Sequence, residues 1–241
     1  MKSLHIDDIR FRVAMARRIL HRNGCDTGIP QHVSERCADA DEFWVTALDH
    51  GDTTTPGCVA RFDFAKQLLE PGDEHSPPLE YAPDYIEIYQ RRPDVRAVVH
   101  THSFWAMVLC AVGEPVGMFN TTASLLHERQ AVWADDLDRQ RPRDVRIADA
   151  LGDATVLLMR NHGLVVAGQS LEEATVLAGV VEEQAHLHLE ASRRGATELP
   201  LEHLRSTRTA HDATYVRQTW AADVRRLRRT DPDLFDWLAA G

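Results

Sequence analysis

Short apolar runs that alternate with amphipathic segments constrain the fold of this chain more than any other feature. The run AVVH (97–100) is brief and β-branched, which is typical of a buried strand. The segment ATVLLMRNHGLVVAG (154–168) predicts two further short strands with a polar break between them. Amphipathic helices are predicted over 6–22 and from Ser170 to about Arg194. Together these segments predict one α/β domain with a mixed sheet.

The rest of the chain carries weaker periodic signals. Alternation of polar and apolar residues predicts strands at 43–48 and 59–64, and proline marks a loop at 71–78. The other segments predicted to be helical are 84–90, 104–112, 127–151 (loosely) and 212–229. Ser170 precedes Glu173 by three residues, which is the spacing of a helix-capping box.

The charge balance excludes one class of partner. The chain has 27 Lys and Arg residues against 37 Asp and Glu residues, a formal net charge of −10. Nucleic-acid binding by phosphate neutralisation needs a basic face and is disfavoured. No run reaches the ~18–20 apolar residues of a membrane helix, and acidic residues replace the apolar stretch of a signal peptide. We therefore expect a cytoplasmic protein that binds a small molecule.

Lysine is nearly absent, which limits the chemistry of carbonyl substrates. Lys2 and Lys66 are the two lysines, so 27 minus 2 leaves 25 arginines among the basic residues. Schiff-base catalysis requires a lysine desolvated in a pocket. Lys2 is terminal and Lys66 lies in a mixed, polar segment. Carbonyl chemistry in this protein should use another electron sink.

The strongest functional signal is a pair of histidines at the end of the 97–100 strand. His100 and His102 are two residues apart in VVHTHS. Residues two apart on a strand point to the same face, so both imidazoles can reach one metal ion. Backbone hydrogen bonds could satisfy the same two rings without a metal.

A third histidine lies at the break between the two strands of 154–168. His162 is preceded by Asn161 and followed by Gly163 in MRNHGLVV. Gly163 permits positive φ, so we expect the sharp turn at this glycine. Three neutral imidazoles at strand ends suit zinc, manganese, iron or cobalt and leave coordination positions open for a substrate.

These motifs resemble those of the class II aldolase/adducin family. The resemblance rests on HVSER (32–36), AVVHTHS (97–103), and RNHGLVVAG (160–168) followed by Ser170 to Ala174, and it runs from about residue 9 to residue 190. It implies a three-layer α/β/α sandwich with a central mixed, mainly antiparallel sheet. It also implies a homotetramer with sites at subunit interfaces. We expect one such domain over 1–241, with 196–241 as a helical C-terminal extension.

The resemblance also implies a divalent metal on His100, His102 and His162. Zn²⁺ is the expected ion, and Fe²⁺ or Mn²⁺ would also suit the ligands. Sugar-phosphate aldolases of the family carry two serines and a general-base glutamate before the helix at 84–90. The matching position here is Tyr81, with Glu80 beside it, and both serines are absent. The expected substrate is therefore not phosphorylated, and Glu80 is the candidate catalytic base.

Other candidate site residues come from the same comparison of motifs. The resemblance points to a decarboxylase-like branch of the family, in which His32 and Ser34 could orient a carboxylate or hydroxyl group. Arg36 could bind an anion or pair with Glu35 or Asp39. Trp105 could form an aromatic wall of the pocket or pack in the core. Tyr215, in the C-terminal part, could donate a proton to the substrate at a neighbouring subunit's site.

The sequence therefore predicts a divalent-metal-dependent carbon–carbon lyase, a decarboxylase or an aldolase, acting on a non-phosphorylated hydroxy or oxo acid through a metal-stabilised enolate. Loss of carbon dioxide needs an electron sink and a proton donor but no carboxylate base, which favours decarboxylation. One alternative is a non-haem Fe(II) oxygenase acting on an aryl 2-oxo acid. A second alternative is a non-catalytic, adducin-like binding domain.

Overall fold

The computed structural model describes residues 5–27, 31–47, 51–73, 85–134 and 141–239, with side chains described outside 209–213 and 239. An eight-stranded sheet in the order β4-β3-β2-β1-β5-β8-β7-β6 forms the centre. The strands are β1 (His32–Arg36), β2 (Glu42–Thr46), β3 (Val59–Asp63), β4 (Leu68–Glu70), β5 (Ala97–Thr101), β6 (Gln130–Trp133), β7 (Val156–Met159) and β8 (Gly163–Gly168). Only the β6–β7 pair is parallel among the pairings described, so the mixed, mainly antiparallel sheet is confirmed.

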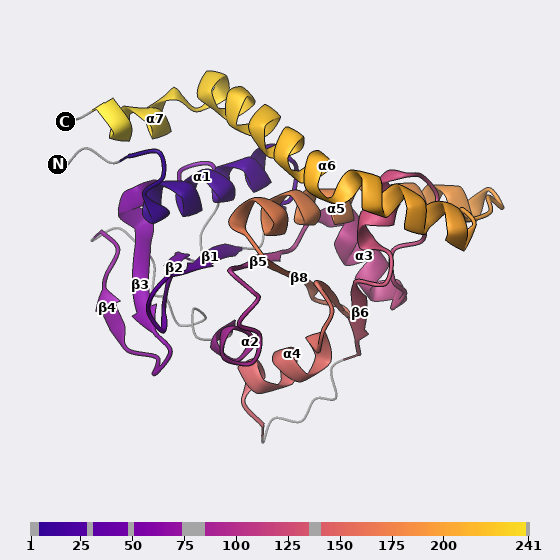
Figure 1. Ribbon diagram of the computed structural model, residues 1–241, viewed down its shortest axis with the longest axis horizontal. Coiled ribbons are helices and arrows are strands. Elements are labelled where there is room, and N and C mark those ends of the chain that lie inside the picture. The colour runs from indigo at the N-terminus through magenta and orange to yellow at the C-terminus, as the bar shows by residue number, and fades with distance from the viewer. Residues whose placement is uncertain (1–4, 28–30, 48–50, 74–84, 135–140, 240–241) are drawn as a thin grey trace.

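Helices cover both faces of the sheet (Figure 1). The α-helices are α1 (Ile9–Arg22), α2 (Ile86–Arg91), α3 (Phe104–Val112), α4 (Arg143–Leu151), α5 (Leu171–Arg193), α6 (Leu201–Thr230) and α7 (Pro232–Ala239). Two short 3₁₀ segments are η1 (Pro56–Cys58) and η3 (Thr122–Leu126). Helices α1, α3, α5 and α6 pack over one face, and α2 and α4 pack over the other. The structure thus has the three layers of an α/β/α sandwich.

The central strands separate two apolar cores. Val99 and Val166 point into the core under α1 and α5, whereas Val98 and Val165 point into the core beside α2 and α4. This alternation follows from the two-residue period of a strand, and it explains why the central runs are apolar throughout. By the same period, His100 lies on the α2–α4 side, at the end of β5.

The sequence prediction missed three strands. β1 falls in HVSER, a polar stretch for which no strand was predicted, and its ladders with β2 and β5 stabilise it. β6 lies in the segment expected to be loosely helical and pairs with β7. β4 pairs with β3 at the edge of the sheet. Pairing partners distant in the chain determine such short strands, and a local pattern does not carry that information.

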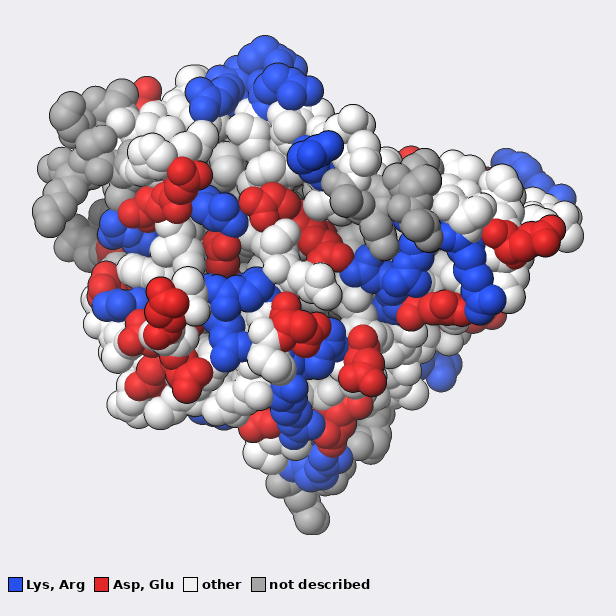
Figure 2. Space-filling model, in the orientation of Figure 1, with Lys and Arg blue, Asp and Glu red and all other residues white. Residues whose placement is uncertain are grey.

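The C-terminal helix is longer than predicted. The expected helix over 212–229 is α6, which begins at Leu201, and the following DPDLFDWL segment forms α7. Among the described residues, no helix combines the length and the apolar character needed to cross a bilayer. On the face shown in Figure 2, acidic and basic side chains are interspersed over most of the surface.

Candidate metal centre

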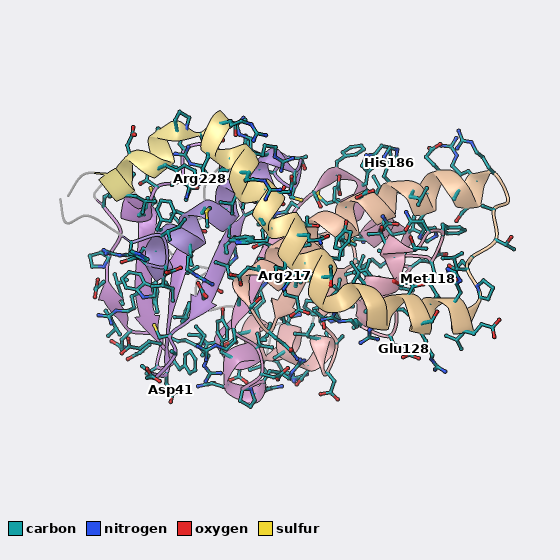
Figure 3. All side chains as sticks on the ribbon, turned by 45° about the horizontal axis from the view of Figure 1, so that its top comes forward. Asp41, Met118, Glu128, His186, Arg217 and Arg228 are labelled. Carbon is teal, nitrogen blue, oxygen red and sulfur yellow. The ribbon has the colours of Figure 1, made fainter. Side chains whose placement is uncertain are left out.

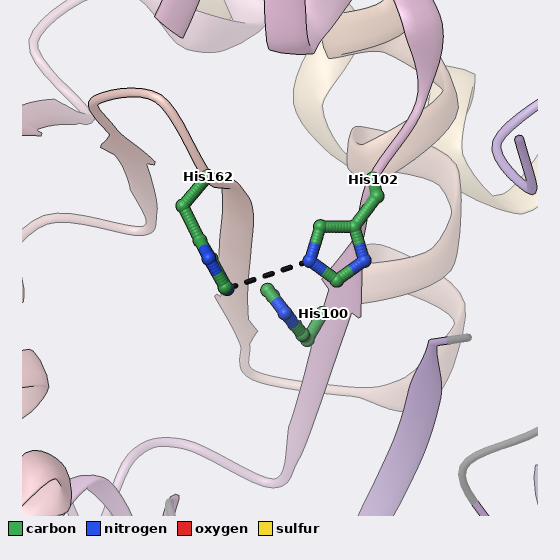
Figure 4. Close-up of side chains that lie close together, drawn as sticks. All are labelled: His100, His102 and His162. Atoms are coloured by element: carbon green, nitrogen blue, oxygen red, sulfur yellow. Dashed lines mark hydrogen bonds between the residues drawn. The ribbon is translucent and has the colours of Figure 1, made fainter. Parts of the chain in front are cut away.

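Three imidazole rings from two distant stretches of the chain meet at one end of the central strands (Figure 4). One ring nitrogen from each of His100, His102 and His162 lies within 4.8 Å of the others. Nε2 of His102 is 3.4 Å from Nε2 of His162. The rings of His100 and His162 are stacked, with centroids 5.2 Å apart. This histidine triad (His100, His102 and His162) is the convergence that the sequence predicted.

The local backbone explains why His162 reaches the other two rings. The sequence predicted the sharp turn at Gly163, and this prediction is wrong in detail because the residue with positive φ is Asn161, at 57°. Asparagine tolerates the left-handed region better than most residues because its short side chain can bond locally. The turn ends β7 and directs His162 toward the end of β5.

Gly163 has a different role, which is close packing. A Cβ atom built on this residue would lie 2.5 Å from the carbonyl oxygen of Thr101 and 2.8 Å from Cδ2 of His102. Any side chain larger than hydrogen would therefore push β8 away from the segment that carries two of the three rings. The glycine brings the backbones of the two histidine motifs together.

A hydrogen bond fixes the orientation of His100. Its Nδ1 lies 2.8 Å from the carbonyl oxygen of Leu164 on the paired strand. Since a carbonyl oxygen only accepts, Nδ1 carries the proton and Nε2 keeps its lone pair. Backbone carbonyls commonly hold metal-binding histidines in this way. The triad therefore offers a preoriented nitrogen donor to a divalent ion.

The electrostatics of the centre favour a neutral His100 ring. Burial lowers the pKa of His100 well below its ordinary value, and the neighbouring His102, His32 and His162 rings shift this pKa in the same direction. A neutral imidazole retains the lone pair that binds a metal. Three such donors fit a divalent cation with further coordination positions open, as in catalytic zinc sites.

His32 lies next to the triad. It pairs with His100 across the β1–β5 ladder, and the two rings are 5.5 Å apart, edge to face. Burial lowers the pKa of His32 to about 3, helped by the positive charge of Arg17 and by His102 and Arg143. His32 is therefore a neutral ring beside the candidate metal ligands.

Ser34 and Arg36 lie farther along the same strand. The hydroxyl of Ser34 is buried, 2.7 Å from the Tyr89 hydroxyl, and donates to the carbonyl of Val98. Arg36 lies at the far end of β1 from His32, where it donates to the carbonyl of Tyr89 and is 3.5 Å from Asp41. The structure does not bring Arg36 to the triad.

Trp105 and Tyr215 line a separate cavity of about 460 Å³ between α3, α5 and α6. The ring of Trp105 stacks on the ring of His186 of α5, with centroids 4.0 Å apart (His186 is labelled in Figure 3). None of the triad is among the described residues lining this cavity. Within one copy of the chain, neither residue is brought to the triad. Glu80 and Tyr81 lie outside the described residues.

Two residues near the triad were not predicted from the sequence. Tyr85, just before α2, is buried, with its ring 4.8 Å from His32 and 6.1 Å from His100. Arg143, the first residue of α4, places Nη2 3.0 Å from Nε2 of His162. Arg143 lies in an arginine-rich stretch, and Tyr85 precedes a short helix, so neither carries a recognisable motif.

Two named relatives are similar in sequence to this chain over more than three quarters of its length. The chain is 31% identical over 201 residues to 3,4-dihydroxyphthalate decarboxylase of Arthrobacter keyseri, covering 77% of this chain and 79% of that relative. It is 28% identical over 212 residues to 4-hydroxy-3-prenylphenylpyruvate oxygenase/4-hydroxy-3-prenylbenzoate synthase of Streptomyces roseochromogenus subsp. oscitans, covering 83% of this chain and 74% of that relative.

The fold and the family are shown by two further comparisons. The structure of L-fuculose 1-phosphate aldolase from Glaciozyma antarctica superposes with a TM-score of 0.82 at 19% identity, covering 93% of this chain and 90% of the other. The family model of the class II aldolase and adducin N-terminal domain matches residues 11–189, which is well over half of the chain. The chain, with its α/β/α sandwich and paired histidine motifs, belongs to the class II aldolase/adducin family.

Proposed function

We propose that this protein is a divalent-metal-dependent carbon–carbon lyase that acts on a non-phosphorylated hydroxy or oxo acid. The observation that carries the proposal is the histidine triad, with one ring nitrogen from each residue within 4.8 Å of the others. A divalent ion held there would serve as a Lewis acid and as the electron sink for the breaking carbon–carbon bond. Zn²⁺ is the ion we propose first, because three imidazoles with open positions are typical of catalytic zinc.

Within this proposal, decarboxylation is favoured over aldol cleavage. The relative from Arthrobacter keyseri supports it, because its name describes decarboxylation of a dihydroxylated aromatic acid. Aldol cleavage needs a base for a hydroxyl proton, the role proposed for Glu80. Loss of carbon dioxide requires no such base. His32 contributes a neutral, buried ring beside the triad, and we propose that it faces the substrate.

The remaining proposed roles involve residues that one copy of the chain does not bring to the triad. Tyr215 as proton donor and Trp105 as pocket wall would have to act at a neighbouring copy's site, which is why a homotetramer is part of the proposal. Sedimentation would test the assembly, and cell fractionation would test the expected cytoplasmic location.

Ser34 supports the site through its buried contact with Tyr89. Arg36 is left out because it is engaged at the far end of β1.

The decisive experiment removes one ligand of the triad. His100→Ala should abolish metal binding and turnover together, measured as metal content per chain and as release of carbon dioxide or aldehyde from a panel of hydroxy and oxo acids. His203→Ala is the matched control, since His203 is exposed on α6. Activity in His100→Ala without bound metal would contradict the proposal. A wild-type protein that binds no metal would favour the adducin-like, non-catalytic alternative.

A second substitution separates the two lyase reactions. Glu80→Gln should lower kcat severely in an aldolase, because the base would be lost, and mildly in a decarboxylase. Steady-state kinetics on the substrate found in the panel would distinguish the two outcomes. The Glu80→Asp variant is the control that retains the carboxylate.

A second candidate function is an Fe(II)-dependent oxygenase. The similarity to the Streptomyces roseochromogenus relative, whose name includes an oxygenase, favours it. Three imidazoles also suit ferrous iron. Oxygen uptake with an aryl pyruvate, measured on protein purified without oxygen and loaded with iron, tests this candidate. Oxygen consumption in proportion to product would replace the lyase proposal.

A further inference from the structure

Arg143 lies directly against the histidine triad. Its Nη2 is 3.0 Å from Nε2 of His162. A guanidinium group only donates hydrogen bonds, so the lone pair on His162 Nε2 accepts this one. Nε2 of His162 is also the nitrogen that lies 3.4 Å from Nε2 of His102. The arginine therefore approaches the edge of the His162 ring that faces His102.

The backbone that carries Arg143 is firmly held. Asp144, the next residue, is buried and accepts a hydrogen bond from Lys66 Nζ at 2.7 Å. Arg146 lies over the ring of Trp133, and Ile147 is fully buried in the core beside α2. The first turn of α4 is thus fixed against β6 and the core. Its first side chain is presented toward the triad from a rigid element.

A metal ion in the triad would change the surroundings of this guanidinium. The lone pair that accepts from Arg143 would then be shared with the cation, and Arg143 would lose that acceptor. A permanently charged guanidinium would also face a divalent cation a few ångströms away, and the two repel. An anion between them would satisfy both, and a carboxylate matches the planar fork of arginine.

We propose that Arg143 binds a carboxylate group that the substrate keeps through the reaction. The proposal rests on the metal-dependent lyase function given above. If Arg143 bound the carboxylate that is lost as carbon dioxide, it would stabilise the ground state more than the transition state, because carbon dioxide is neutral. Arg143 would therefore hold a second, retained acid group next to the atoms that chelate the metal. The preferred substrates are then acids with a carboxylate adjacent to their chelating oxygens.

A pair of ligands tests this assignment without turnover. Acetohydroxamate chelates a metal through two oxygens, and its analogue with a carboxylate in place of the methyl group retains those two oxygens. Affinities of both ligands would be measured by calorimetry, and by absorption of the Co²⁺-loaded protein. We expect the wild type to bind the carboxylate analogue at least about tenfold more tightly. Arg143→Gln should lose that preference while retaining the metal.

Two further variants complete the test. Arg143→Lys should keep part of the preference, because the charge remains but the paired hydrogen bonds do not. Arg141→Gln removes a nearby exposed arginine that pairs with Asp149, and it should leave the preference unchanged. The same preference in Arg143→Gln and Arg143→Lys as in the wild type would overturn this inference and leave the lyase proposal intact. A wild-type protein that holds no metal would instead refute the proposed function.

Discussion

The β5–β8 strand pair and the C-terminal helices are stabilised by different interactions. Every residue of β5 and β8 is buried, and the two strands form a continuous antiparallel ladder. In α6, the described side chains that are buried are Leu204, Asp223 and Leu227. Figure 3 shows α6 running across the molecule, with Arg217 and Arg228 labelled on it.

Ion pairs hold the junction between α6 and α7 against α1. Asp231, between α6 and α7, is buried and accepts from Arg22 Nε at 2.9 Å and from Arg18 Nη1 at 3.2 Å, both on α1. The triad lies at one end of the strand pair, and His100 faces the α2–α4 side of the sheet, the side opposite α6. Metal binding should therefore depend on close packing of the strands, whereas the C-terminal ion pairs should affect stability alone.

Gly163→Ala should have the largest effect, because it acts on the strand pair. The new Cβ would meet the Thr101 carbonyl oxygen at 2.5 Å, so β5 and β8 must separate. We expect a loss of about 2–3 kcal/mol in the free energy of unfolding and a fall of about tenfold or more in metal affinity. Urea denaturation and metal titration measure the two effects.

The matched control for that substitution is Gly179→Ala in α5. A Cβ there would meet Asn23 Nδ2 at 3.7 Å, an ordinary contact. Alanine in a helix is favoured over glycine by roughly 0.5–1 kcal/mol. Gly179→Ala should therefore be neutral or stabilising and should leave metal binding unchanged. Equal behaviour of the two variants would contradict the role given to Gly163.

Asp231→Asn should have a smaller effect, confined to stability. It removes the charge that Arg18 and Arg22 contact and should cost about 2 kcal/mol, with metal affinity unchanged. Asp233→Asn is the control, since Asp233 also pairs with Arg18 but its side chain is 63% exposed; it should cost less than about 1 kcal/mol. A drop in metal affinity in Asp231→Asn would show that the two regions are coupled.

The contribution of Asp231 to stability should depend on pH. Burial alone would raise the pKa of Asp231, but hydrogen bonds from Arg22, Thr230 and Arg18 outweigh it and hold this pKa below its ordinary value of 3.8. The folded state therefore binds fewer protons, and the stabilisation is present above that value and is lost as the pH falls below it. The stability gap between wild type and Asp231→Asn should shrink between pH 6 and pH 3, as measured by urea denaturation. A constant gap would refute this assignment.

Ser170→Ala should have the smallest effect of the series. The Ser170 hydroxyl caps α5 by accepting from the Glu173 amide at 3.1 Å. Loss of an N-cap costs about 1 kcal/mol of stability. Helix α5 packs on the face of β5 and β8 opposite the α2–α4 side, toward which His100 points. Thermal denaturation should show the loss, with metal affinity unchanged and with Ser192→Ala, in the exposed last turn, as the neutral control.

The pairing of His100 with His102 could be predicted because its geometry is local. The two-residue spacing of His100 and His102 places both rings on one face of a strand wherever that strand lies. The α5 N-cap at Ser170 was likewise predicted from the spacing of two residues and is confirmed. The prediction was wrong at the turn between β7 and β8. Asn161 adopts the positive φ that was expected of Gly163, and Gly163 is instead needed for the close approach of two backbone segments.

Contacts between distant segments were beyond the sequence analysis. HVSER has no strand pattern of its own, and it becomes β1 because β2 and β5 lie on either side. Arg143 and His162 are 19 residues apart and meet only because α4 packs beside β7. The single domain with a helical extension over 196–241 and the roles of Glu80 and Tyr215 stay predictions.

Local sequence patterns were enough to predict the α/β class, the apolar central strands and the three histidines, because each depends on spacing along a short stretch of chain. The tertiary structure decided which rings and charges surround those histidines. Pairing of β1 with β5 brings His32 to His100, and packing of α4 brings Arg143 to His162. Such neighbours depend on the folded arrangement of distant segments, and no local pattern encodes that arrangement.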